Sequence, residues 1–302
     1  MHPRQPIRGL GLLVALACLA AAPTWTVTGK HPNGEIARAT LNVDTPLGPV
    51  VGAKGSDFGR HPNGKLSFCT VAAPTVVDGI PIAKGAYTLF HPNERVWQTT
   101  VSKALTFTPG KVTVACAANE LVTFYDDGTF DHCQLDKPLT VGGVVCDVGH
   151  GVAFSRAGKL QAATLGAPYT ALGVTFPKGT WLSFDDAAQV VGGTIKDALV
   201  VRGLLVTYEF KAHGNGKLAE VVLAAATTVQ GHAFPERAKL TFRADGTLEK
   251  SQFVEKHGFM IHGEEWHDTR HTTYDAKGAA VTSWVDHWQS DVPKPVYKPK
   301  KP

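Results

Sequence analysis

The densest group of residues with metal-binding chemistry lies near the C-terminus of the chain. Three acidic residues stand among four histidines there: His257, His262, Glu264, Glu265, His267, Asp268 and His271. On a β-strand, alternation places His267, Thr269 and His271 on one face. Imidazoles and carboxylates that converge from one hairpin are ligands of the kind that zinc and copper sites use.

A polar face on the last hairpins is the alternative to a metal site, with Trp266, Trp284 and Trp288 covering the end of the fold. We favour this alternative because a chain with 13 histidines produces such spacings by chance. An end hairpin also offers little of the second shell of hydrogen bonds that holds metal ligands in place. We therefore predict no metal site, no cofactor and no catalytic residue.

Paired carboxylates are the remaining candidates for acid–base chemistry. They occur at Asp126-Asp127, Asp185-Asp186 and Glu264-Glu265. The first two pairs fall on turn sequences, where Asp is favoured because its side chain bonds the backbone of the turn. The chain also lacks a Gly-x-Ser-x-Gly elbow, a phosphate-binding loop and a dinucleotide fingerprint. We predict that the protein is not an enzyme.

A repeat of about 30 residues sets the elements that must position all these groups. His-Pro-Asn-Gly stands at residues 31–34 and 61–64, and a worn copy, His-Pro-Asn-Glu, stands at 91–94. Looser turn sequences continue the frame and make nine anchors, at spacings of 30, 30, 34, 30, 30, 28, 30 and 32; they end at Gly34, Gly64, Glu94, Gly128, Gly158, Ala188, Gly216, Gly246 and Gly278. Such a period is the signature of a repeat architecture. The copying of a whole turn accounts for His31, His61 and His91, where we predict no metal.

Apolar residues recur at fixed distances from each anchor and define the strands. Two residues after the anchor come Ile36, Leu66, Val96, Phe130, Leu160, Val190, Leu218 and Leu248; seven after it come Leu41, Val71, Val101, Leu135, Leu165, Ile195, Leu223 and Phe253; four before it come Phe90, Phe124, Phe154, Phe184, Phe242 and Tyr274. Asn-Gly and Asp-Gly suit the positive φ of two-residue hairpin turns. Each repeat also has a second segment marked by turn-forming glycines, clearest at 77–85, which indicates two more short strands around a glycine turn.

These patterns predict an all-β fold of tandem repeats of about 30 residues, arranged as an antiparallel β-meander or β-solenoid. Residues 25–290 form a single array of about nine repeats, in which stacked neighbours bury the apolar face that one repeat cannot bury alone. An open meander, a closed barrel and a solenoid all fit this pattern. No stretch of the array shows the period of an amphipathic helix flanked by caps.

The four cysteines of the array occupy two equivalent positions of the repeat. Cys69 and Cys133 lie five residues after an anchor glycine, whereas Cys116 and Cys146 lie eight residues before the recurring Phe. An even number in an exported chain favours disulfides, and the absence of Cys-x-x-Cys argues against zinc. We favour a Cys133–Cys146 bridge, with Cys116–Cys133 as the rival. Free buried thiols remain the alternative, since the same positions elsewhere hold Ala163, Val221, Ile82 and Phe176.

The two ends of the chain differ in composition from the array. Residues 1–22 have the basic start and short apolar run of a secretory signal peptide, and we expect a periplasmic or extracellular protein, with lipid attachment at Cys18 as a less favoured alternative. Residues 291–302 are rich in Pro and Lys, which predicts a disordered tail. These ends carry much of the net charge of +4. The array itself is nearly neutral, which argues against nucleic acid as a partner.

The phrase that places an aromatic residue four positions before the anchor, as in Phe242-Arg243-Ala244-Asp245-Gly246-Thr247-Leu248, resembles the hairpin repeats of MORN-type proteins. The period here is about 30 residues, against roughly 23 in those arrays. The resemblance implies stacked hairpins in an elongated sheet that serves as a scaffold or binding surface, and it implies no catalytic residue.

We therefore expect a non-enzymatic, exported structural or binding element of the bacterial envelope. Its partner would be an envelope polymer (glycan or lipid) or another envelope protein, and after signal removal it would not be an integral membrane protein. The alternatives are a periplasmic lipid- or glycan-carrying factor and a metal-dependent enzyme that uses the C-terminal histidines. A continuous apolar trough would favour the carrier, and a buried His–carboxylate trio would favour the enzyme. A filled core with a polar exterior would favour the scaffold.

Overall fold

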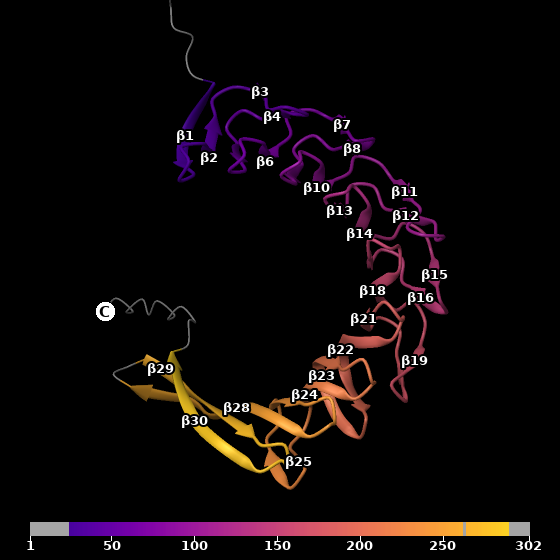
Figure 1. Ribbon diagram of the computed structural model, residues 1–302, viewed down its shortest axis with the longest axis vertical. Coiled ribbons are helices and arrows are strands. Elements are labelled where there is room, and N and C mark those ends of the chain that lie inside the picture. The colour runs from indigo at the N-terminus through magenta and orange to yellow at the C-terminus, as the bar shows by residue number, and fades with distance from the viewer. Residues whose placement is uncertain (1–23, 262–263, 290–302) are drawn as a thin grey trace, which may run out of the picture.

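The computed structural model describes residues 24–261 and 264–289, and every helix or strand in them is a β-strand. Eighteen strands pair antiparallel, each with the next, in one sheet. Their bounds in sheet order are β1 (Trp25–Lys30), β2 (Ile36–Leu41), β5 (Asp57–Arg60), β6 (Leu66–Thr70), β9 (Tyr87–Phe90), β10 (Val96–Thr100), β13 (Leu121–Phe124), β14 (Phe130–Gln134), β17 (Gly151–Phe154), β18 (Leu160–Thr164), β21 (Trp181–Phe184), β22 (Val190–Val201), β23 (Leu204–Ala212), β24 (Leu218–Leu223), β27 (Lys239–Phe242), β28 (Leu248–Ile261), β29 (Glu264–Tyr274) and β30 (Ala280–Gln289). The predicted all-β antiparallel meander is confirmed. The sheet curves into an open crescent with β1 at one end and β30 at the other (Figure 1).

Six small two-stranded hairpins form a second layer on the convex side of the crescent (Figure 1). They are β3 (Thr45–Pro46) with β4 (Val51–Gly52), β7 (Thr75–Val77) with β8 (Ile80–Ile82), β11 (Leu105–Phe107) with β12 (Val114–Cys116), β15 (Leu139–Val141) with β16 (Val144–Cys146), β19 (Tyr169–Ala171) with β20 (Val174–Phe176), and β25 (Thr227–Val229) with β26 (His232–Phe234). The second segment of each repeat, marked by turn-forming glycines, was expected to form such a hairpin. Asp78 and Gly79 both have positive φ (51° and 80°) between β7 and β8, as a type I′ turn requires.

The core lies between the two layers and is filled by the recurring apolar residues. Every member of the column four residues before the anchor is buried, from Phe90 at 1% exposure to Tyr274 at 6%. The residues two and seven positions after the anchor are also buried, except Ile36 and Phe253, which are partly buried. Burial of apolar surface is the main favourable term in folding, so these columns hold each repeat against its neighbours.

The anchor turns differ from the predicted two-residue type. At the first anchor, the N–H of Gly34 donates to the carbonyl of His31 at 2.9 Å, and the N–H of His31 donates to the carbonyl of Glu35 at 2.8 Å. Only Gly34, at +88°, has a positive φ there. This is a type I turn closed by a glycine bulge, and all nine anchors share the bond between the first and fourth residues. Pro32 would be the first residue of a two-residue Asn-Gly turn, where its missing N–H could not donate across the hairpin, whereas its φ near −65° suits the second position of a type I turn.

Two anchors carry a side chain at the bulge position that suits glycine. Ala188 has a φ of +59°, and it is exposed. Because the left-handed region costs an L-residue about 1 kcal/mol, we expect Ala188→Gly to raise the free energy of unfolding by about 0.5–1 kcal/mol. Ala187→Gly, one residue earlier and without positive φ, is the matched control and should lower stability. Urea denaturation of the three proteins decides this, and equal effects of the two variants would contradict it.

Strands in the C-terminal third are longer than the short strands that the sequence predicted. β22 and β28 have 12 and 14 residues. The register of the pairing between β22 and β23 shifts between Ile195 and Leu199. Beyond this shift, the end of β22 and the start of β23 form the equivalent of an outer hairpin. The hairpin is thus fused to the sheet through a β-bulge. Among the described residues, no helix is long and apolar enough to span a membrane.

The predicted signal peptide, Cys18 and the Pro/Lys-rich tail lie outside the described residues.

Candidate functional site

The recurring His and Asn of the anchors form a hydrogen-bond ladder along one edge of the crescent. Nε2 of His31, His61 and His91 lies 2.7, 2.9 and 3.0 Å from a carbonyl oxygen of the next repeat, at Arg60, Phe90 and Phe124. Because a carbonyl only accepts, each Nε2 carries the proton and donates. The amides of Asn33, Asn63, Asn93 and Asn215 donate to the next turn in the same way. Copying alone does not account for these residues, because each makes a bond between repeats.

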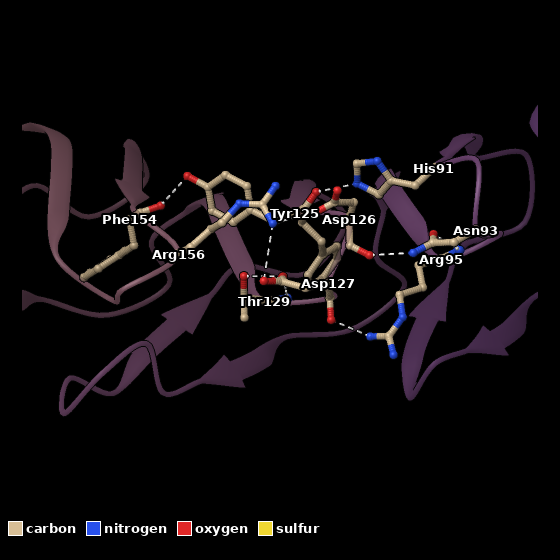
Figure 2. Close-up of polar contacts among 10 residues, drawn as sticks. His91, Asn93, Arg95, Tyr125, Asp126, Asp127, Thr129, Phe154 and Arg156 are labelled. Carbon is tan, nitrogen blue, oxygen red and sulfur yellow. Dashed lines mark hydrogen bonds and ion pairs between the residues drawn. The ribbon is translucent and has the colours of Figure 1, made fainter.

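Where an anchor lacks His and Asn, other side chains make the hydrogen bonds between repeats (Figure 2). Asn93 donates to the carbonyl of Asp126 at 2.7 Å, and the next turn has an Asp in the place of Asn. A carboxylate cannot donate, so Arg156 reaches back and binds Asp126 at 2.5 Å. The hydroxyl of Tyr125 replaces histidine and donates to the carbonyl of Phe154 at 2.9 Å. Each of these bonds joins one repeat to the next.

The carboxylate pair Asp126-Asp127 belongs to this ladder and lacks the properties of a general acid. The hydrogen bond from Arg156 lowers the pKa of Asp126, and hydrogen bonds from Thr129 lower the pKa of Asp127. Both side chains are about half exposed. A catalytic acid needs a raised pKa near the working pH, so the shift runs in the opposite direction. Asp185 similarly caps its own turn by accepting from the N–H of Ala187 and Gln189.

A disulfide joins Cys116 to Cys133, with the two Cα atoms 5.8 Å apart. The favoured Cys133–Cys146 pairing is wrong, and the rival pairing is the one in the structure. Four of the outer hairpins pack on the sheet strand of the following repeat, as the bridge between Cys116 and Leu135 shows for one of them. Cys146 therefore lies over β18 instead of β14. Burial raises the pKa of Cys146 to about 11 and that of Cys69 to about 12, so both remain buried thiols.

The C-terminal histidines do not converge within the described side chains. His271 lies 3.1 Å from Asp286 and stacks on Trp284, with ring centroids 5.2 Å apart and planes inclined by 8°. His287 binds Asp268 at 2.6 Å. Among the residues whose side chains are described, no three His, Cys, Asp or Glu are placed to hold a metal ion. The side chains of His257, His262, Glu264, Glu265, Trp266 and Trp288 lie outside that set.

Two adjoining hollows lie on the concave face of the C-terminal strands. The first, of about 430 Å³, is bounded by Glu220, Lys239, Lys250 and Trp284; the second, of about 460 Å³, is bounded by Arg237, Thr269 and Asp286. Lys239, Gln252 and His271 line both. Trp284, expected to cover the end of the fold, is instead 46% exposed at this cleft. It stands on β30, which pairs with β29 alone among the described strands.

The electrostatics of the first hollow are set by one carboxylate among three lysines. Glu220 lies 3.3 Å from Lys211 and 3.1 Å from Lys239. Partial burial opposes ionisation, but hydrogen bonds from Lys239 and Lys211 prevail and lower the pKa of Glu220. Within the part of the chain that the structure describes, Lys250 has no carboxylate partner. Sequence reasoning missed this group because its lysines come from three separate strands, β23, β27 and β28.

Aromatic and apolar side chains line the concave face nearer the N-terminus. In β9, Thr88 and Phe90 are buried, so alternation directs Tyr87 and Leu89 to the concave side. Tyr87 is 51% exposed, and its ring lies 5.7 Å from that of Phe68 on β6. The concave face therefore offers exposed aromatic groups near both ends of the crescent.

No protein-family model and no curated protein matches the chain.

Proposed function

We propose that the protein is an exported, non-enzymatic binding element of the bacterial envelope whose concave face holds an elongated glycan. The observation that carries this proposal is the concave face itself, a continuous curved sheet with exposed aromatic rings at Tyr87 and Trp284. Adjacent strands lie about 4.8 Å apart and present side chains at regular intervals, which suits a polymer with a repeating unit. Aromatic rings supply flat apolar area at low entropic cost, and sugars stack on such rings.

Three further features support this function over the alternatives. The space between the layers is filled by large buried side chains such as Phe58, Phe154 and Phe176. A lipid carrier would need that space as a trough. His271 of the C-terminal cluster and the nearby His287 each pair with a single carboxylate, which does not favour a metal-dependent enzyme. The Cys116–Cys133 disulfide is compatible with export, because disulfides persist in oxidising compartments.

Binding to a series of cell-wall glycans of increasing chain length tests this proposal. We expect affinity to rise with the number of sugar units until the chain spans several strands. Replacing Tyr87 by Ser should weaken binding about three- to tenfold, the equivalent of one lost aromatic contact. Val76, an exposed residue of the convex hairpin β7–β8, provides the matched control, and Val76→Ser should leave affinity unchanged. Isothermal titration calorimetry gives both values. Absence of binding to every glycan, or equal losses in the two variants, would reject the proposal.

A further inference from the structure

Cations from neighbouring strands gather at the C-terminal cleft of the concave face. Lys211 stands opposite Glu220, and Glu220 stands opposite Thr241, which pairs with Lys250. In the adjacent row, Lys239 stands opposite Gln252, and Gln252 opposite His271. With Arg237 at the rim, four cations face three carboxylates, those of Glu220, Asp286 and Glu236, the last of which lies 3.9 Å from Arg237. The cleft therefore has an excess of positive charge although the array as a whole is nearly neutral.

An aromatic wall closes one side of the cleft. One face of the Trp284 indole is covered by the His271 ring that stacks on it. Trp284 stands on β30, whose partner among the described strands is β29 alone. Its other face is therefore turned toward the open edge of the sheet. A pyranose ring stacked on this outer face would lie at the rim of the hollow, and the next sugar unit of the same chain would reach the ammonium groups of Lys239 and Lys250.

We infer that the C-terminal cleft is a subsite for a carboxylate-bearing polysaccharide, in which lysines bind the uronate carboxylates and Trp284 stacks on a sugar ring. The inference rests on the proposed glycan-binding function and names the ligand class at one end of the face. Ammonium groups recognise a carboxylate through charge-assisted hydrogen bonds, which are stronger than neutral ones. Gln252, Thr241 and Thr273 line the same hollow and supply neutral partners for sugar hydroxyls.

Glu220 limits the affinity of this subsite, so its replacement provides a test in which tighter binding is the expected result. It neutralises Lys211 and Lys239, the two cations nearest to it. Replacing Glu220 by Gln keeps the shape of the side chain and frees both lysines for a ligand. A variant that binds more tightly than the native protein cannot be explained by damage to the fold.

Titration with oligogalacturonate, and with a neutral cello-oligosaccharide of the same length, measures the preference for acidic sugars. We expect the native protein to bind the acidic probe at least about tenfold more tightly, and the preference to shrink as salt screens the charges. Lys239→Glu with Lys250→Glu should abolish the preference, and Glu220→Gln should increase it. Trp284→Ala should weaken both probes. Lys84→Glu, the same type of substitution at one position of an exposed loop far from the cleft, should leave the preference unchanged.

Two outcomes with the sugar probes would overturn the subsite. One is equal affinity of the native protein for the two probes, and the other is a preference that survives the double lysine variant. If neutral glycans still bind in either case and Tyr87→Ser still weakens them, the proposed function stands without this subsite. Tighter binding of a single-stranded oligonucleotide than of oligogalacturonate would also reject it, in favour of a general polyanion site. Circular dichroism of each variant confirms that the sheet is retained.

Discussion

Ala163→Cys is expected to form a second disulfide, with Cys146, and to raise the free energy of unfolding by about 3 kcal/mol, the value for a loop of this length. Ala163 follows Cys146 by seventeen residues, as Cys133 follows Cys116. Cys133 pairs with Val122 across the sheet, and Ala163 pairs with Val152 at the equivalent position. Both sites are fully buried. The repeat thus provides the backbone geometry of a disulfide where one sulfur is missing.

Cys69, the other cysteine with a free thiol, provides a matched control for this experiment. Gly52 precedes Cys69 by the same seventeen residues, but a Cβ at Gly52 would lie 2.5 Å from Cδ1 of Leu41 and 2.6 Å from Cδ1 of Leu47. Gly52→Cys should therefore destabilise the protein and leave both thiols free. Alkylation and mass spectrometry should find Cys69 as the only free thiol of the array in Ala163→Cys. A free Cys146 in that variant, or a gain in denaturation midpoint that persists under reducing conditions, would contradict the prediction.

Gly158→Ala is expected to cost about 3 kcal/mol or more, the largest loss among the anchor turns, because two separate penalties apply. Gly158 has a φ of +71°, which strains any other residue. A Cβ at this position would also meet the backbone of Gly110, with the Gly110 Cα only 2.7 Å away and the amide nitrogen closer still. Gly110 belongs to the long loop between β11 and β12, which accounts for the anchor spacing of 34 residues. Backbone atoms cannot rotate away as a side chain can.

Gly246→Ala separates the two penalties. Gly246 occupies the same turn position at a φ of +88°, but the atom nearest to its added Cβ is Cδ of Lys217, a flexible side chain, at 3.4 Å. This variant should lose about 1–2 kcal/mol, from the backbone conformation alone. Thermal and urea unfolding of both variants give the two values. If Gly158→Ala loses no more than Gly246→Ala, the contact between the β11–β12 loop and the anchor turn contributes nothing to stability.

Both glycan-binding proposals depend on exposed side chains of the concave face. Tyr87 and Trp284 stand on strands separated by most of the array. Alternation in β9 directs Tyr87 to the concave face, and Trp284 lines the hollow at the C-terminal end of that face. The cleft at the C-terminal end lies where the repeat becomes irregular, with fused hairpins and a terminal strand. Such departures from a repeat remove the neighbour that would otherwise cover a side chain, so they are places where a binding site can form.

Local pattern alone determined the antiparallel meander, the core columns and the positions of the turns. Alternation at Tyr87–Phe90 and the glycine at each anchor are short-range properties, set by the pleat of a strand and the φ of a turn. The turn type is not set by Asn-Gly alone, because this pair also suits a two-residue turn; at the first anchor the missing N–H of Pro32 argues against that turn. The equivalence of Cys116 with Cys146, and of Cys133 with Ala163, was likewise visible as two positions of one repeat.

Only the tertiary structure decided which repeats touch. Cys116 pairs with Cys133 because the outer hairpin lies over the sheet strand of the next repeat. No local propensity encodes this offset. The ladder of His61 and Asn63 depends on the stacking of successive turns, which turns a copied motif into a set of bonds between repeats. The cationic cleft arises in the same way, because Lys211, Lys239 and Lys250 are far apart along the chain and meet only when their strands align in register.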